Sequence, residues 1–140
     1  MSKSDEITGN NEGQPVKDNR RYPRVEHNSE VILVVTKEEL LNTTLQDISP
    51  DGLQVRFDND IALAIKPLLD LISDNTIKEF EVRFTLSMPE QEQQIITGCR
   101  PIYIMKIDQN LFGMGMQFTV MNSENSGYIQ KFIEYSMEPQ

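Results

Sequence analysis

Short segments that alternate apolar and polar residues recur between residues 30 and 121, and they constrain the fold of this chain more than any other feature. Two of them, NTTLQDI at 42–48 and LQVRF at 53–57, lie close together, and they follow EVILVVTK at 30–37, which is a β-branched run. A side-chain period of two is typical of a β-strand with one buried face, and β-branched residues favour it. SPDG at 49–52 has the residues of a tight turn. The sequence therefore predicts consecutive antiparallel strands.

Three further segments are predicted strands: FEVRFTLSM at 80–88, which alternates clearly, QQIITGCRPIYIMKI at 93–107 and LFGMGMQFTVM at 111–121. The second is long, and it contains Gly98 and Pro101. Glycine and proline inside a strand indicate a bulge or an irregular edge. The chain therefore has about six short strands, and we expect them to be antiparallel.

Two segments have helical spacing instead. Apolar residues in 58–78 follow a helical period, but Pro67 interrupts them, so we expect one or two short helical turns there. A second helical pattern spans about 123–137 and lacks an internal proline. The predicted fold is mainly β: a six-stranded antiparallel barrel over about 22–121, a C-terminal α-helix and a short helical insertion.

Length and composition indicate one folded domain. The chain has 140 residues, of which 38% are hydrophobic and 25% are charged, as in ordinary soluble proteins. Residues 1–19 are polar and contain few large apolar groups, so we expect a flexible N-terminal tail before a domain at 20–140. No apolar run reaches the roughly 20 residues of a membrane helix, and the N-terminus does not have the pattern of a secretory signal. We expect a cytoplasmic protein with no membrane partner.

The residues give little support to enzyme chemistry. Cys99 is the only cysteine and His27 the only histidine, so neither a disulfide framework nor a zinc cluster is expected. No catalytic triad and no glycine-rich phosphate loop is recognisable. Cys99 lies in an apolar strand and reads as a small core residue, although a Cys–His nucleophile pair is the alternative. We expect a protein that is not an enzyme and holds no metal and no cofactor.

Three of the six arginines lie within five residues, Arg20, Arg21 and Arg24, in a chain whose formal net charge is -9. A guanidinium binds phosphate oxygens bidentately and also fits the O6 and N7 edge of guanine. The overall negative charge disfavours DNA or RNA polymers, but a small anion needs only a local positive patch. The alternative is a solvated basic stretch that nearby carboxylates neutralise.

A second motif lies at the predicted turn and consists of Asp47, Ser49 and Gly52. A carboxylate accepts two hydrogen bonds side by side, which matches the N1–H and N2–H donors of guanine, and a serine hydroxyl can donate or accept. Glycine allows a close approach of the backbone. The alternative is a well-formed hairpin turn with no ligand.

The combination RRYPR…DISPDG, followed by GMGMQF, resembles the PilZ domain, a bacterial receptor module for cyclic di-GMP (c-di-GMP). The resemblance covers about residues 20–132. It implies a six-stranded barrel that binds the dinucleotide on its outer surface. By this resemblance Arg20 and Arg24 grip phosphates and guanine edges, and Arg21 lies between them. The residues that receive a guanine from the barrel are then Asp47, Ser49 and Gly52.

The chain also differs from the family pattern. Many members lack an insertion such as 58–78. A further ligand contact often comes from the strand before the Gly-x-x-Phe strand, and Arg100 and Tyr103 are its candidates here. Asn19 precedes the arginine motif, at a position that influences how many dinucleotides bind in the family.

The resemblance implies a monomeric receptor or adaptor that changes conformation on binding c-di-GMP and relays the signal to a downstream protein, with motility, biofilm or virulence outputs. One alternative is a PilZ-fold interaction module that acts without the nucleotide, for example in pilus assembly. Another is a small barrel that binds RNA or single-stranded DNA, which the absence of tryptophan and the acidic balance disfavour.

Overall fold

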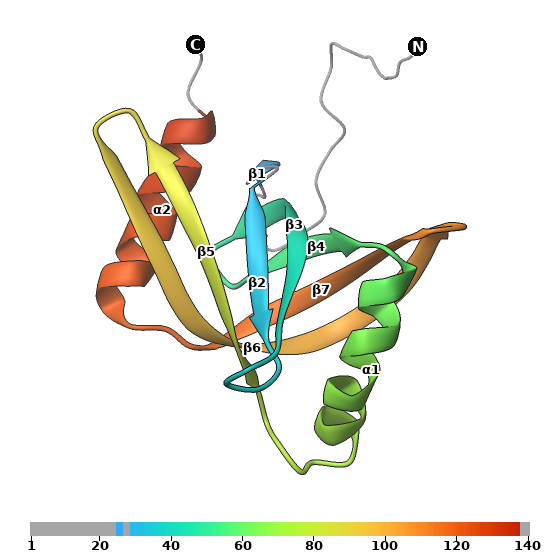
Figure 1. The fold of residues 1–140 in the computed structure, drawn as a ribbon. Helices are drawn as coiled ribbons and strands as arrows, with labels where there is room; N and C mark the ends of the chain where they lie inside the picture. Colours follow the sequence, from blue (N-terminus) through green and yellow to red (C-terminus); the bar gives the residue numbers. More distant parts are fainter. Residues whose placement is uncertain (1–24, 27–28, 138–140) are drawn as a thin grey trace.

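Six antiparallel strands close into a ring around one apolar core in the computed structural model, which describes residues 25–26 and 29–137 (Figure 1). The strands are paired in the order β3-β2-β5-β6-β7-β4, and β4 pairs again with β3. A two-residue strand, β1, adds to the edge of β3 beyond β2. The elements are β1 (Val25–Glu26), β2 (Glu30–Val34), β3 (Leu40–Ser49), β4 (Gly52–Phe57), α1 (Asn59–Ser73), β5 (Phe80–Met88), β6 (Gln91–Asp108), β7 (Leu111–Val120) and α2 (Ser123–Met137).

The predicted six-stranded antiparallel fold with a C-terminal helix is confirmed. The alternating patterns place one face of each strand in the core, where the side chains are almost fully buried. β5 coincides with the predicted segment 80–88, and the turn between β3 and β4 lies at the predicted SPDG. The side chains that carry the core of the ring include Val31, Leu33, Leu45, Ile48, Val55, Val82, Leu86, Ile95 and Met114.

The predicted irregularity in β6 is also confirmed. The register between β6 and β7 shifts between Gly98 and Cys99, again between Pro101 and Tyr103, and a third time near the hairpin end. Each shift adds an unpaired residue and bends the strand. β6 is therefore long and bent. It pairs with β5 only as far as Cys99 and continues beyond β5 with β7 alone.

The prediction of one or two short turns in 58–78 is wrong. α1 is one continuous helix of 15 residues with Pro67 inside it. Asp58 caps its start, because the carboxylate accepts a hydrogen bond from the Ile61 N–H at 3.0 Å. An interior proline costs a helix about 3 kcal/mol. Burial of Ile65, Leu68 and Ile72 is worth about 1.5–3 kcal/mol for each side chain, which outweighs that cost.

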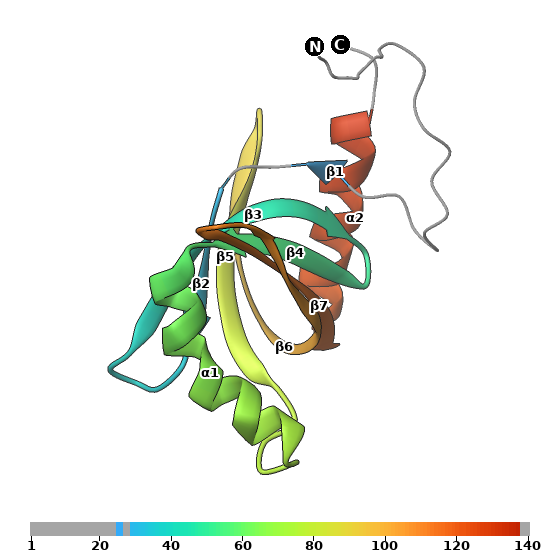
Figure 2. The ribbon, with the colours of Figure 1, turned by 90° about the vertical axis from the view of Figure 1, so that its right-hand side faces the viewer.

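The two helices lie on opposite sides of the ring in both ribbon views (Figures 1 and 2). α2 matches the predicted helix, and the Asn122 carboxamide accepts a hydrogen bond from the Asn125 N–H at 2.7 Å to cap it. Its buried face is formed by Tyr128, Ile129, Phe132 and Ile133. This helix is therefore held by apolar packing against the strands.

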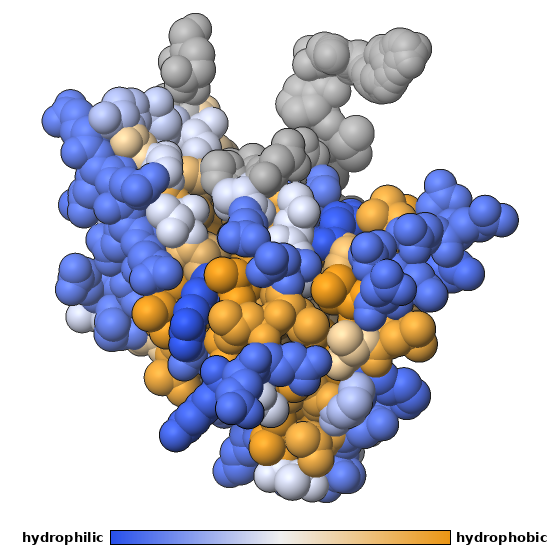
Figure 3. Space-filling view, viewed as in Figure 1, coloured by the Kyte–Doolittle hydropathy of each residue, from blue (hydrophilic) through white to orange (hydrophobic). Residues whose placement is uncertain are grey.

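Several sequence predictions fall outside the described residues: the tail at 1–19, the three arginines of the first motif, and His27. Cys99 is fully buried, as predicted, and burial raises the pKa of its thiol to about 12. Polar and charged side chains cover much of the surface, but an apolar area is also exposed in the middle of the face that Figure 3 shows, to the left of α1.

Candidate functional site

The Asp-Ser-Gly motif lies at the hairpin that joins β3 to β4. Ser49 and Gly52 pair across the turn, and the Ser49 hydroxyl donates a hydrogen bond to the Asp51 carboxylate at 2.8 Å. The Phe118 N–H donates to the Asp51 carbonyl at 2.9 Å, which ties the turn to β7. The motif therefore sits on a hairpin that is fixed from two sides.

Asp47 and Ser49 project from the outer face of the ring. Ile48 between them is fully buried in the core, and successive strand residues point to opposite faces. A register shift between Leu45 and Asp47 marks a bulge just before the motif. Both polar side chains are nevertheless well covered, with 7% of Asp47 and 3% of Ser49 exposed.

Gly52 is required by the packing of β4 against β7. A Cβ atom at this position would lie 2.2 Å from the carbonyl oxygen of Met116, far inside van der Waals contact. Because the neighbour is backbone, it cannot rotate away. The glycine of the motif therefore has a structural reason to be glycine, in addition to any contact with a ligand.

Strand register brings two further candidate site residues, Arg100 and Tyr103, into line with the motif. Paired residues on neighbouring strands share a face, so a row of them runs across the sheet. One row is Ser49, Gly52, Gln117 and Arg100. A second row is Asp47, Gln54, Gly115 and Tyr103. Figure 2 shows β3, β4, β7 and β6, the four strands that these rows cross.

The two rows form one continuous outer surface. Strands lie about 4.8 Å apart, so each row spans about 14 Å from β3 to β6. Tyr103 lies flat on the second row, because a Cβ at Gly115 would be 2.4 Å from its ring. Its side chain is 37% exposed, and Arg100 is exposed as well. The surface thus offers a carboxylate, a hydroxyl, two amides, a guanidinium and an aromatic ring.

A pocket of about 220 Å³ opens at the hairpin end of this surface. It is lined by Ser49, Asp51, Gly52, Ile102, Met116 and Gln117. The sequence predicted two of these residues, and it missed Gln54 and Gln117 of the two rows. Both glutamines occupy polar positions of alternating strands, which was the available signal, but only the register shows that they lie beside the motif.

The arginine motif itself lies outside the described residues, and β1 is the nearest described element. Val25, the residue after Arg24, pairs with Ile48, and Glu26 pairs with Asp47. The described chain therefore enters the sheet directly beside the Asp-Ser-Gly motif.

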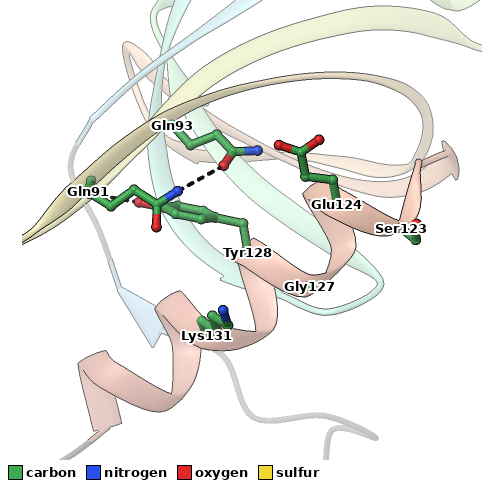
Figure 4. A pocket seen from close by; sticks show the side chains of 7 residues that line it. All are labelled: Gln91, Gln93, Ser123, Glu124, Gly127, Tyr128 and Lys131. Carbon is green, nitrogen blue, oxygen red and sulfur yellow. Dashed lines mark hydrogen bonds between the residues drawn. The ribbon is translucent and has the colours of Figure 1, made fainter.

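A second pocket, of about 310 Å³, lies between α2 and the start of β6 (Figure 4). Gln91 and Gln93 face it from β6, with a hydrogen bond of 3.4 Å between their carboxamides. The Tyr128 hydroxyl lies 2.8 Å from the Gln91 carbonyl oxygen, to which it can donate. None of the predicted site residues that the structure describes lines this pocket.

Two further observations concern metal ligands and membrane-spanning helices. Among residues 25–26 and 29–137, no group of three or more His, Cys, Asp or Glu side chains is placed to hold a metal ion. In the same part of the chain, neither helix has the length and apolar character needed to span a membrane.

Comparison with solved structures shows the same fold in several bacterial proteins. The inhibitor of motility MotI (DgrA) of Bacillus subtilis superposes with a TM-score of 0.63 at 17% identity, over 86% of this chain and 53% of that one. MrkH of K. pneumonia in complex with c-di-GMP gives 0.58 at 17% identity, over 85% and 52%. PlzA of Borreliella burgdorferi, also in complex with c-di-GMP, gives 0.50 at 6% identity, over 84% and 54%.

This chain spans about half the length of those three proteins. No curated protein matches it at a significant level. A family model described as the PilZ domain matches residues 18–135, which is most of the sequence. The chain therefore belongs to the PilZ domain family.

Proposed function

We propose that this protein is a receptor for c-di-GMP, and that it binds the dinucleotide on the outer surface of β3, β4, β7 and β6. The observation that carries the proposal is the pair of rows that aligns the Asp-Ser-Gly motif with Arg100 and Tyr103. Membership of the PilZ family supports it, as do the c-di-GMP complexes of MrkH and PlzA.

The arginine segment supplies the positive charge that the surface needs. The ligand carries two phosphates, and Arg20 and Arg24 bind them and the guanine edges, with Arg21 between them. Arg24 precedes Val25 directly, and consecutive Cα atoms are about 3.8 Å apart, so β1 keeps the segment within reach of Asp47 and Ser49.

The strand surface supplies the contacts that distinguish guanine. The Asp47 carboxylate accepts from N1–H and N2–H, the Ser49 hydroxyl completes the polar edge, and Gly52 leaves room for the base. Arg100 and Tyr103 contribute at the far end of the rows, by charge and by stacking. No step in this account makes or breaks a covalent bond, so the protein acts as a receptor and not as an enzyme.

Binding draws the N-terminal segment onto the strand surface and creates a new face for a downstream protein. Charge-assisted hydrogen bonds, each worth about 1.5–3 kcal/mol, hold that segment in the complex. The output can be motility, biofilm formation or virulence. A domain that works without the nucleotide would bind its partner equally well in the absence of c-di-GMP.

Isothermal titration calorimetry of the full chain with c-di-GMP tests the proposal directly. We expect binding in the micromolar range or tighter, about −8 kcal/mol or more favourable. Arg24→Ala and Asp47→Asn are expected to weaken binding by about 10- to 100-fold, from the loss of one charged hydrogen-bonding group. Asp47→Asn keeps the shape of a covered side chain, so unfolding does not confuse the result.

Arg83→Ala is the matched control. Arg83 belongs to β5, outside both rows, and its guanidinium pairs with Glu81 at 2.5 Å. This variant should bind like the wild type. No heat of binding with the wild type at about 50 µM protein would refute the proposed function.

A further inference from the structure

Nine residues of β6, from Arg100 to Asp108, form a free strand edge. Among the described residues this half of β6 pairs with β7 on one side only, because β5 pairs no further than Cys99. A free edge presents backbone N–H and C=O groups without strand partners, and it is a template for another strand.

The side chains of this edge are unusually apolar for an exposed strand. The exposed fractions are 58% for Ile102, 44% for Ile104, 49% for Met105 and 42% for Ile107. Exposed apolar residues that are contiguous mark an interaction surface more often than scattered ones do.

The sequence of the edge, RPIYIMKID, is complementary to itself in the antiparallel direction. If a second copy is placed across a two-fold axis at Ile104, that residue faces its own equivalent. Tyr103 then faces Met105 of the other copy, and Arg100 faces Asp108. The two ends of the edge therefore carry opposite charges, and the pair of Arg100 with Asp108 forms twice in the dimer.

The bulges of β6 fit the same arrangement. One register shift lies between Pro101 and Tyr103, and another lies between Lys106 and Asp108, on either side of Ile104. The extra residues are Ile102 and Ile107, which face Lys106 and Pro101 of the other copy. One bulge of each copy therefore lies in the stretch opposite the other bulge, and residues 100–103 of one copy still match residues 105–108 of the other. The four paired side chains stay on the outer face, because their β7 partners are alternate residues, Gln117, Gly115, Gly113 and Leu111.

The charges at the two ends are available for such a contact. Arg100 and Asp108 are both exposed, and within the described part of the chain neither forms a salt bridge. The Asp108 carboxylate only accepts a hydrogen bond from the next backbone N–H, at 2.8 Å.

We infer that the free edge of β6 pairs with the same edge of a second copy of this chain, and that the two rings join through one continuous antiparallel sheet. The contact is small, because nine residues extend only about 30 Å along a strand. It should therefore be weak, with a dissociation constant of about 1–100 µM. This association does not require the proposed ligand.

Sedimentation velocity of the full chain without nucleotide is the test, at concentrations up to about 300 µM. We expect the wild type to shift from monomer to dimer over this range. Arg100→Asp and Asp108→Arg each place like charges together twice, and each should weaken dimerisation by about tenfold or more. An equimolar mixture of the two variants restores both opposite-charge pairs, and it should dimerise like the wild type.

Lys131→Asp on α2 is the control, since it changes the net charge equally at an exposed site away from the edge. It should dimerise like the wild type. A wild type that stays monomeric at about 300 µM overturns the inference and leaves the edge to a strand of another protein. A dimer that both charge variants leave intact, or a mixture that does not restore the dimer, overturns it as well.

Discussion

At the scale of single residues, Gly52 and Gly127 differ in what a side chain would contact at their positions. A Cβ at Gly52 would meet the Met116 carbonyl oxygen at 2.2 Å, whereas a Cβ at Gly127 in α2 would meet no atom within 4 Å. Gly52→Ala should therefore lower the free energy of unfolding by about 3 kcal/mol. Gly127→Ala should raise it by about 0.5–1 kcal/mol, because alanine favours the helix. Urea unfolding monitored by circular dichroism measures both, and equal effects would contradict this account of the β4–β7 contact.

Cys99 gives the protein a specific dependence on alkaline pH. Burial raises the pKa of the thiol from 9.0 to about 12, so the folded state keeps a proton that the unfolded state loses. Between pH 9 and 12 the unfolded state binds fewer protons, and stability falls as pH rises, by about 1.4 kcal/mol per pH unit. Below pH 9 this contribution is constant.

The measurement compares the wild type with Cys99→Ala in urea at pH 8, 9 and 10.5. The Cys99→Ala variant should be less stable than the wild type at pH 8, because the smaller side chain leaves a cavity in the core. The difference between their free energies of unfolding should be smaller by about 2 kcal/mol at pH 10.5 than at pH 8. A difference that does not change with pH would show that the thiolate forms in the folded state at its ordinary pKa.

At the scale of elements, the sequence predicts strands better than it predicts α1. Alternation identifies each strand because burial of one face leaves a direct trace in the residue order. The sequence does not predict the full length of α1, because an interior proline normally ends a helix. The helix continues past Pro67 because three of its side chains are buried in the core, and only the tertiary structure shows that burial. The same limit applies to the site. The motif at Asp47 and Ser49 is visible in sequence, but the alignment of Arg100 and Tyr103 depends on bulges whose position fixes the register.

We expect that Pro67 destabilises α1 and that the helix does not require it. Pro67→Ala adds a backbone N–H to an exposed position of the helix, and it should raise the free energy of unfolding by about 1–3 kcal/mol. Lys66→Ala, at the neighbouring exposed position, should change it by less than about 0.5 kcal/mol, since its ion pair with Asp70 is on the surface. A destabilised Pro67→Ala variant would mean that α1 needs the bend of a proline to reach the core.

At the scale of the whole molecule, the ring, the site and the free edge share β6. Its first half closes the ring with β5, and its second half carries Arg100 and Tyr103 and then the unpaired edge. The sequence predicts a monomer, because it does not show the register in which β5 pairs with β6 and so gives no sign of the free edge. In the proposed dimer Arg100 faces a carboxylate, and in the proposed complex it faces a dinucleotide. The two states therefore compete for one guanidinium, and c-di-GMP should favour the monomer.

The division of the chain into a tail and a domain can be tested by two truncations. Among the residues that the structure describes, the buried core lies between Val31 and Ile133, so removing residues before Val25 should leave the fold intact. A chain that starts at Arg20 keeps the whole arginine motif and should bind c-di-GMP within about twofold of the full chain. A chain that starts at Val25 keeps the strand surface but loses all three arginines, and its binding should fall by about 100-fold or more. Calorimetry on both chains, with thermal unfolding to verify the fold, decides the matter. Equal loss in the two would place essential contacts before Arg20, and no loss in either would remove the arginines from the site.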